Sequence, residues 1–278
     1  MNKTWLITGT SGGFGRAMAE TLLARGDRVA ATTRKFRSLD DLAARFGERL
    51  WRREMDLTAN ADVEQVVAEA FWELGRVDVV VSNAGYGLFG AVEEVSHEQL
   101  VRQVEVNLLG SMRLVRAVLP HLRVQGGGRI LQVSSVGGQV AYPGLGVYHA
   151  TKWGIEGFIE ALIPEVAPFG IQATLIEPGA ARTAWAGENA DWAHPLSHYE
   201  KSLVGAMRRR MSTAGSQAFA GDPHRIAQAM IDCANERKAP RRLTLGSDAY
   251  EAMHSALKSR LHALEAQRSV ALSTDADA

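Results

Sequence analysis

The chain has 278 residues and a mass of 30.1 kDa, with 46% hydrophobic and 22% charged residues, which is ordinary for a globular protein with a hydrophobic core. This composition excludes an intrinsically disordered chain, a collagen-like fibre and a coiled-coil rod. The 31 basic and 31 acidic residues cancel, so the overall charge gives no sign of a nucleic-acid or anionic-membrane partner.

The rarer residue types narrow the class of protein further. The sequence holds one cysteine, Cys233, which excludes an intramolecular disulfide and a cysteine-based zinc site, and we expect it to be buried. His194 and His198 are four residues apart, but no third ligand is near, so we expect no metal. The first apolar run is too short for a signal peptide, and no stretch approaches the roughly 20 apolar residues of a membrane span. We therefore expect a soluble, cytoplasmic protein.

Apolar runs typical of strands alternate with helical patterns along most of the chain. Several runs, such as residues 77–81, lack polar alternation, which indicates strands buried on both faces of a mostly parallel sheet. Repeated strand and helix predict one doubly wound α/β domain of the Rossmann type over residues 1–266, with seven strands and helices on both faces. The expected strands are 5–8, 28–33, 50–55, 77–82, 129–134, 172–176 and 242–245. The expected helices are 16–25, 61–74, 98–123 and 147–167.

Three late segments depart from this alternation. Residues 183–219 form a long connection rich in Trp, Met and Arg, and such connections in compact domains are usually functional lids or locally helical insertions. Residues 247–266 have the pattern of an amphipathic helix. Residues 267–278 are expected to form a disordered tail.

A glycine-rich turn follows the first expected strand and leads into a helix. Glycines there permit a tight turn and a close approach of the backbone to a pyrophosphate, while the helix N-terminus offers free N–H groups to the anion. A P-loop would need Gly-Lys-Ser/Thr, which does not follow Gly15. The turn therefore predicts a dinucleotide site. The residues expected to line it are Gly9, Ser11, Gly12, Gly13, Phe14 and Gly15.

The end of the second expected strand bears on the choice of cofactor. NAD-binding units usually place an acidic residue there, to bond the ribose 2′-hydroxyl. Here Thr33 is followed by Arg34 and Lys35, two cations suited to a 2′-phosphate. This favours NADP(H). If the two cations only form a solvated basic turn, NAD(H) stays possible.

Tyr148 and Lys152 lie four residues apart in an expected helix, so one helix face presents both side chains. Tyrosine titrates near ~10 in water, and a cation one turn away stabilises the phenolate and lowers that pKa. A hydroxyl from Ser134 or Ser135, at the end of the preceding strand, could hold a substrate carbonyl oxygen beside the phenol. In this context the spacing indicates an acid–base site.

Together these motifs resemble the short-chain dehydrogenase/reductase family, in its compact single-domain branch, strongly over about residues 3 to 183. Thr8 begins the family's Thr-Gly-x-x-x-Gly-x-Gly cofactor motif. The resemblance implies an adenine contact, an Asn-Ala-Gly turn and a segment that contacts the nicotinamide carboxamide. The matching residues are, in that order, Asp56 and Leu57; Asn83, Ala84 and Gly85; Pro178, Gly179 and Thr183.

The resemblance also implies a catalytic group of Asn107, Ser135, Tyr148 and Lys152. Ser135 precedes Tyr148 by the family's usual 13 residues, which favours it over Ser134. Tyr148 would then exchange a proton with the substrate oxygen, and Ser135 would hydrogen-bond that oxygen. Lys152 would contact the nicotinamide ribose and lower the tyrosine pKa, and Asn107 would hold a water that links Lys152 to solvent.

The substrate region leaves several interpretations open. An apolar pocket under the 183–219 segment, completed by residues 87–89 and 140–145, would suit a hydrophobic ketone or secondary alcohol. The stretch 134–143 is similar to the steroid and retinol dehydrogenases of the family. The same apolar side chains could instead pack the lid or a subunit contact. Those side chains are Trp185, Trp192, Tyr199, Leu203 and Met207.

The sequence thus predicts an NADP(H)-dependent ketone reductase or alcohol dehydrogenase. The resemblance implies a homodimer or homotetramer paired through the expected helices 98–123 and 147–167. Gly9, Gly12 and Gly15 also fit the spacing of the extended branch, with its epimerases and dehydratases, although that branch has a larger substrate domain. A third hypothesis is a non-catalytic nicotinamide-binding sensor.

Overall fold

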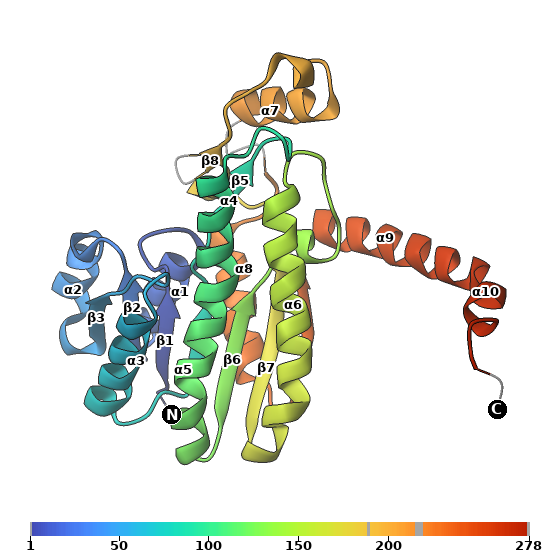
Figure 1. Cartoon of the computed structure of the whole chain (residues 1–278). Helices are drawn as coiled ribbons and strands as arrows, with labels where there is room; N and C mark the ends of the chain where they lie inside the picture. Colours follow the sequence, from blue (N-terminus) through green and yellow to red (C-terminus); the bar gives the residue numbers. More distant parts are fainter. Residues whose placement is uncertain (1, 188–189, 215–218, 277–278) are drawn as a thin grey trace.

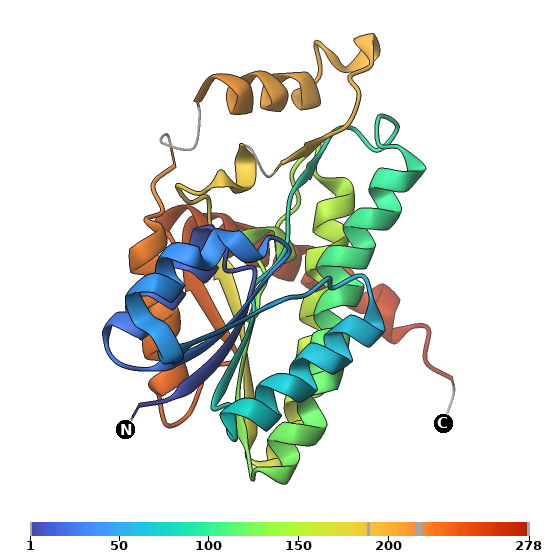
Figure 2. The ribbon, with the colours of Figure 1, turned by 90° about the vertical axis from the view of Figure 1, so that its left-hand side faces the viewer.

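Seven parallel strands form one sheet in the order β3-β2-β1-β4-β6-β7-β9, with helices on both faces (Figures 1 and 2). The computed structural model describes residues 2–187, 190–214 and 219–276. The predicted doubly wound α/β fold is confirmed, because each strand pairs in parallel with its neighbours. The strands are β1 (Thr4–Thr8), β2 (Arg28–Thr33), β3 (Leu50–Glu54), β4 (Val79–Ser82), β6 (Gly128–Val133), β7 (Ile171–Pro178) and β9 (Arg242–Leu245).

Two hydrophobic cores sandwich the sheet. Side chains of β1 alternate between them, so Leu6 packs in one core while Trp5 and Ile7 pack in the other, and every residue of β1 is buried. The two helical layers lie on opposite sides in Figure 2. One layer is α3 (Asn60–Leu74), α5 (Gly110–Val124) and α6 (Gly146–Val166); the other is α1 (Gly13–Ala24), α2 (Asp40–Phe46) and α8 (Pro223–Asn235).

The strand order reverses between β1 and β4. The chain runs outward from β1 to β3, then returns to place β4 on the other side of β1. In open α/β sheets the crevice at such a reversal, beyond the carboxyl ends of the strands, is where ligands bind. The glycine-rich turn after β1 and the Asn-Ala-Gly turn after β4 therefore meet at the predicted site.

The expected helix 98–123 is divided in the structure. It begins as α4 (His97–Val104), capped by Ser96, whose hydroxyl accepts from Gln99 N while the Gln99 side chain accepts from Ser96 N. A π-helical turn, Glu105–Leu109, follows, and α5 completes the rod. Such turns often mark functional positions in helices.

The segment between β7 and α8 lies above the carboxyl edge of the sheet (Figure 1). It contributes β8 (Asp191–Trp192), which pairs in parallel with β5 (Leu88–Phe89), and α7 (Leu203–Ala214). The chain after it returns to the sheet as β9, so the larger second domain of the extended branch is not formed by the described residues.

The last helices leave the body of the molecule. α9 (Ser247–Ala266) packs through Ala249 and Met253 and then projects outward (Figure 1). The expected tail from residue 267 begins with a short helix, α10 (Arg268–Leu272), and its described residues are exposed. Cys233 is buried in α8, as predicted. Within the described ranges no helix is long and apolar enough to cross a membrane.

Candidate active site

The glycine-rich turn packs directly against the Asn-Ala-Gly turn. Asn83 Nδ2 donates to the carbonyl oxygens of Thr8 (2.9 Å) and Gly9 (3.2 Å). Gly9 has a φ of +70°, and a Cβ there would lie 2.9 Å from Ala84 Cα. A Cβ on Gly15 would lie 2.6 Å from Asn83 Nδ2. Both positions therefore require glycine, because any side chain would push the two turns apart.

The N-terminus of α1 offers hydrogen-bond donors beside this turn. Its N-cap residue, Gly12, has no side chain to cap the helix, and the N–H groups of Gly13 and Phe14 make no hydrogen bond to the described residues. Free N–H groups and the positive end of the helix dipole attract an anion. Ser11, on the same turn, is exposed. These residues fit the pyrophosphate of a dinucleotide.

Two unpaired cations follow β2. Arg34 and Lys35 are exposed, and within the described residues neither side chain has an ion-pair partner. The carboxylate of Asp56, after β3, accepts from Thr58 N (2.9 Å) and Thr58 Oγ1 (2.8 Å). The backbone bond from Thr58 is the main cause that lowers the pKa of Asp56, and the charge of Arg34 adds to it. Leu57 is buried against α5, where a Cβ on Gly110 would contact it.

Ser135, Tyr148 and Lys152 meet beyond the carboxyl end of β6. Tyr148 and Lys152 lie on the buried face of α6, with 4% and 7% of their surfaces exposed. The Ser135 hydroxyl bonds the Tyr148 phenol and accepts from Gly137 N (3.0 Å). Lys152 Nζ donates to Val133 O (3.0 Å) and lies 5.7 Å from the centroid of the Tyr148 ring. The structure therefore brings together the three groups that the sequence analysis singled out.

Burial shifts both titrating groups of this cluster. It raises the pKa of Tyr148 to about 12, although the bond from Ser135 opposes the shift. It lowers the pKa of Lys152 to about 8, and the negative charge of Glu156 opposes that shift. The lowered tyrosine pKa expected from the sequence is therefore absent here, because desolvation of the phenolate outweighs the neighbouring groups.

Asn107 lies in the π-helical turn and is almost fully buried. Its Oδ1 accepts from Tyr86 N (3.1 Å) and its Nδ2 donates to Tyr86 O (2.8 Å), which fixes the chain just after the Asn-Ala-Gly turn. Gln103 Nε2 donates to the same carbonyl (3.1 Å). The sequence analysis did not predict a role for Gln103, although Gln103 lies four residues before Asn107 and therefore shares a helix face with it.

An aromatic wall covers the phenol. The Trp185 ring centroid lies 5.1 Å from that of Tyr148 and 5.4 Å from that of Phe89, and Phe89 stacks on Trp192 at 4.6 Å. A Cβ on Gly87 would lie 2.7 Å from Trp185, so glycine leaves room for the indole. Two of the five expected lid residues thus reach the wall.

The other three lid residues lie further out. Leu203 is 72% exposed, and the Tyr199 hydroxyl donates to Glu93 (2.9 Å). Met207 packs over Gly144, in the expected wall segment 140–145. Thr183 lies beside Gly13, since its Cγ2 is 3.6 Å from the point where a Cβ on that glycine would be. Pro178 and Gly179 end β7, and Gly179 N donates to Leu245 O (2.8 Å).

His149 fixes the loop that carries Ser135. Its Nε2 accepts from Tyr142 N (2.9 Å), so the proton is on Nδ1, which donates to Gly137 O (2.9 Å). Burial lowers the pKa of His149, and this favours the neutral ring that these two bonds require.

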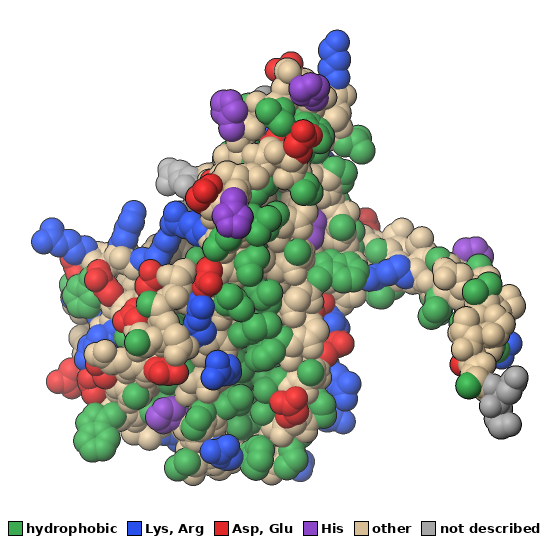
Figure 3. Space-filling view, viewed as in Figure 1, with side chains coloured by type: hydrophobic (Ala, Val, Ile, Leu, Met, Phe, Trp, Pro, Cys, Tyr) green, Lys and Arg blue, Asp and Glu red, His purple; other side chains and the backbone are tan. Residues whose placement is uncertain are grey.

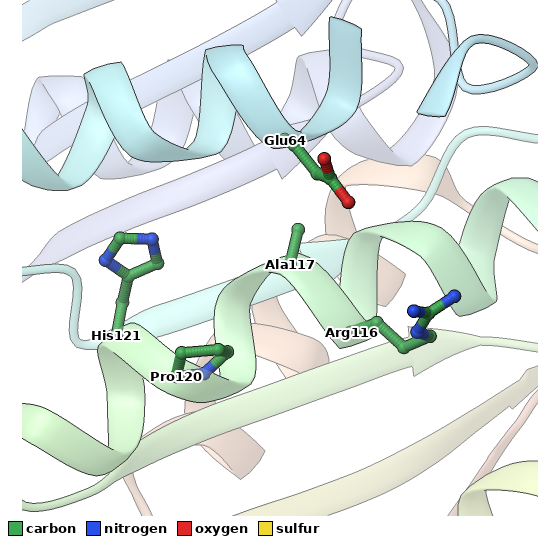
Figure 4. A pocket seen from close by; sticks show the side chains of 5 residues that line it. All are labelled: Glu64, Arg116, Ala117, Pro120 and His121. Carbon is green, nitrogen blue, oxygen red and sulfur yellow. The ribbon is translucent and has the colours of Figure 1, made fainter. Parts of the chain in front are cut away.

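Two surface hollows lie away from this cluster. Figure 4 shows one between α3 and α5, with a volume of about 250 Å³. It is lined by Glu64, Arg116, Ala117, Pro120 and His121. Another, of about 180 Å³, lies beside the lid against Trp192, Ala193, Pro195 and Arg208. The phenol itself is closed off by the aromatic wall.

The chain matches the short chain dehydrogenase family over residues 3–194. It is 42% identical over 253 residues to the oxidoreductase BOA17 of Botryotinia fuckeliana, covering 90% of this chain and 91% of that protein. A short-chain dehydrogenase from Streptomyces avermitilis has a similar structure, with a TM-score of 0.91 and 38% identity over 99% of this chain and 100% of that one.

A third similar protein carries a bound cofactor analogue. It is an alcohol dehydrogenase from Thermococcus sibiricus, complexed with 5-hydroxy-NADP, with a TM-score of 0.72 and 28% identity over 88% of this chain and 96% of that one. The family match covers the glycine-rich turn, the Asn-Ala-Gly turn and the Ser-Tyr-Lys cluster. The chain therefore belongs to the short-chain dehydrogenase/reductase family and is an NAD(P)-binding oxidoreductase.

Proposed function

We propose that the protein is an NADP(H)-dependent oxidoreductase that interconverts a hydrophobic ketone and the corresponding secondary alcohol. The observation that carries the proposal is the buried cluster of Ser135, Tyr148 and Lys152 at the same carboxyl edge of the parallel sheet as the uncapped N-terminus of α1. A nicotinamide cofactor, when bound, gives a hydride to the carbonyl carbon or accepts one from it. The residues of this chain orient the reactants and move the proton.

Tyr148 acts as the general acid and base of the reaction. In ketone reduction its phenol oxygen gives a proton to the substrate oxygen, and in alcohol oxidation it takes the proton back. Ser135, already bonded to that phenol, donates to the same substrate oxygen where negative charge develops. Lys152 would supply a nearby positive charge and would hydrogen-bond the ribose of a bound cofactor, and Asn107 would hold the water that connects Lys152 to solvent.

The cofactor contacts follow the geometry of the turns. Gly9, Ser11, Gly12, Gly13, Phe14 and Gly15 would hold the pyrophosphate, and Arg34 the 2′-phosphate that distinguishes NADP from NAD. The adenine end would lie at Asp56 and Leu57. Asn83, Ala84 and Gly85 would border the ribose, and Pro178, Gly179 and Thr183 the nicotinamide.

The substrate class follows from the wall over the phenol. Phe89, Trp185 and Trp192 form an aromatic, uncharged wall over Tyr148. Such a wall favours an apolar or aromatic group next to the reacting carbonyl. Because Trp185 rests on the Tyr148 ring, the lid must move before a substrate reaches the phenol.

Replacing Tyr148 by Phe tests the proposal. With NADPH and a panel of aryl, aliphatic and steroid ketones, we expect kcat to fall about 10²- to 10⁴-fold, because only the proton donor is removed. NADPH affinity, measured by fluorescence titration, should stay within about twofold. Tyr250→Phe, on exposed α9, is the matched control and should keep full activity. Turnover by Tyr148→Phe at the wild-type rate would remove Tyr148 from the mechanism.

The outer faces of α5 and α6 support assembly into a homodimer or homotetramer. Hydrophobic side chains gather along these two helices in Figure 3. Among them are Met112 and Phe158, which are partly buried, and Trp153, which is 44% exposed. An apolar face of this extent on a single chain is typical of a protein contact.

A further inference from the structure

Glu156 is a buried carboxylate one turn after Lys152 on α6. Only 4% of its surface is exposed, and a Cβ on Gly138 would contact its carboxylate, so the loop after β6 is packed closely over it. The hydroxyl of Ser134, the neighbour of Ser135, donates to Glu156 Oε1 (2.6 Å). The carboxylate is therefore attached to the same strand end that carries Ser135 and accepts the Lys152 hydrogen bond.

Arg242 supplies the counter-ion from the far edge of the sheet. Its Nη1 donates to Glu156 Oε2 (2.6 Å) and also pairs with Glu177 of β7, while its Nη2 pairs with Glu160 Oε1 (2.7 Å). Burial raises the pKa of Glu156, while the bonds from the Ser134 hydroxyl and the Arg242 guanidinium oppose that shift and favour the charged form. The favourable ion pairs in turn raise the pKa of Arg242, against the effect of burial.

The charges around Glu156 come from three elements. Lys152 and Glu160 lie on α6, Glu177 on β7 and Arg242 on β9. The loop after β6 adds only uncharged groups to this network, Ser134 and Gln139. The charge that opposes the burial of the Lys152 amine is that of Glu156. No group is better placed to keep that amine protonated among the described residues.

We propose that Glu156 is a positioning residue for Lys152, whose buried carboxylate keeps the lysine amine in its ammonium form beside Tyr148. The inference deepens the proposed function and rests on it for its catalytic consequence. Without the ammonium, a phenolate at Tyr148 loses its neighbouring positive charge. Glu156 thus acts on the proton transfer through Lys152, without touching substrate or cofactor.

Glu156→Gln should shift the pH dependence of ketone reduction in the same direction whether Lys152 or Tyr148 loses its proton first. The Lys152–Tyr148 pair carries one positive charge when both groups are protonated, and none after one proton leaves. Removing a negative neighbour destabilises the positive form, so the first proton leaves at lower pH. Ketone reduction needs both the Tyr148 proton and the positive charge of Lys152, so the alkaline limb of its pH profile moves to lower pH whichever proton leaves first.

The experiment compares Glu156→Gln with Glu160→Gln. The amide introduced by Glu156→Gln keeps the shape of the side chain: its oxygen can accept from Arg242 and its NH₂ group can donate to the Ser134 hydroxyl, so the fold should survive. Glu160 pairs with the same arginine, but its side chain is 52% exposed and lies a turn further from Lys152. We expect the alkaline limb of kcat/KM with NADPH to fall by about one pH unit in Glu156→Gln and to stay in place in Glu160→Gln.

A second measurement needs no turnover. Competitive labelling with acetic anhydride across a pH series gives the midpoint at which Lys152 becomes reactive. Lys152 is the sole lysine between Arg129 and Arg182, so one tryptic peptide reports it. We expect its midpoint to fall by about one pH unit in Glu156→Gln. A loss of thermal stability without a shift of this midpoint would mean that Glu156 only holds β9 to α6, and would overturn the inference.

The two measurements separate the inference from the proposed function. If the labelling midpoint falls but the wild-type chain reduces no ketone, the function is wrong and the link between Glu156 and Lys152 stands. If the wild type reduces ketones but Glu156→Gln shifts neither the alkaline limb of kcat/KM nor the labelling midpoint of Lys152, the inference is wrong. Should Glu156→Gln fail to fold, Glu156→Asp takes its place in the test. The aspartate keeps the negative charge, but its side chain is one methylene shorter, so the carboxylate lies further from Lys152. About half the shift is then expected, and an unmoved midpoint overturns the inference.

Discussion

Arg34 is exposed just after β2, and its guanidinium has no ion-pair partner among the residues that the structure describes. Two other arginines near it are ion-paired, Arg16 with Asp41 and Arg52 with Asp40. A guanidinium without an ion-pair partner, next to the expected position of the cofactor's adenosine, can form two parallel hydrogen bonds to a phosphate.

We therefore expect Arg34→Ala to weaken NADPH binding by roughly 10- to 100-fold, because a charge-assisted contact of about 1.5–3 kcal/mol is lost. NADH binding should change by less than about twofold. Isothermal titration with both cofactors measures the two affinities. Arg34→Lys keeps the positive charge but lacks the two-pronged guanidinium. Its NADPH affinity should therefore lie between those of the wild type and Arg34→Ala. Equal losses for NADPH and NADH would contradict the 2′-phosphate contact.

At this scale the sequence predicted which side chains converge better than it predicted their environment. Ser135, Tyr148 and Lys152 are identifiable because the chemistry requires them at fixed spacings on one strand end and one helix. The pKa of Tyr148 was expected in the wrong direction, because burial by Trp185 and the lid is a tertiary effect. Arg242 could not be linked to Glu156, since 86 residues separate them and only the strand order brings them together.

Among the elements, the lid depends on one buried carboxylate from the body of the protein. The side chain of Glu94, in the loop after β5, is fully buried and accepts from Leu196 N (2.8 Å), Ala91 N (2.7 Å) and Arg208 Nη2 (2.7 Å). Burial alone would raise the pKa of Glu94, but these three bonds outweigh it and lower the pKa. Glu94 therefore attaches both the loop after β8 and α7 to the rim of the site.

Glu94→Gln should loosen the lid, because Arg208 loses a charged partner worth about 1.5–3 kcal/mol. We expect trypsin to cleave within α7 at least about tenfold faster, since cleavage follows the population of the open form. Mass spectrometry of timed digests measures this. Glu93→Gln is the matched control, because its partner Tyr199 lies at an exposed contact worth little. Cleavage of Glu94→Gln at the wild-type rate would rule out this attachment.

The same contact has a defined pH dependence. A carboxyl whose folded pKa is lowered stabilises the folded form fully above its unfolded pKa, roughly 4.3. That contribution is lost as the pH falls through the lowered folded value. The lid should therefore stay docked at neutral pH and loosen only in acid.

Element boundaries were predictable where one local rule decided them. The expected strands 28–33 and 242–245 and the helix 247–266 have the observed bounds, because apolar runs there end at polar or glycine residues. The π-helical turn at Glu105–Leu109 interrupts a continuous helical pattern without any local signal. β5 and β8 have two residues each and exist only because the lid folds back onto the loop after β4.

For the whole molecule, Gly157 offers a direct test of the proposed assembly. It lies at the exposed surface of α6, and a Cβ there would meet nothing within 4 Å in the single chain. Glutamate at this position should not harm the monomer, since replacing a helical glycine gains about 0.5–1 kcal/mol. Across an interface made by α5 and α6, the same carboxylate would be buried without a partner.

We expect the wild-type chain to sediment at two or four times its 30.1 kDa and Gly157→Glu to sediment as a single chain with an unchanged or raised Tm. Sedimentation velocity and thermal unfolding measure these properties. Trp72→Glu is the control, because Trp72 is 88% exposed on α3 and belongs to neither α5 nor α6. A monomeric wild type, or an intact oligomer in Gly157→Glu, would exclude α5 and α6 as the contact.

The position of β9 at the sheet edge has a consequence for protein synthesis. The glycine-rich turn, Tyr148 and Lys152 are translated long before Arg242, and the family match ends at residue 194. A nascent chain that has emerged from the ribosome only as far as α8 holds every proposed catalytic group, but Glu156 and Glu177 lack the Arg242 guanidinium. We expect such a chain to remain inactive until the last strand docks, so translation must pass residue 242 before the enzyme can work.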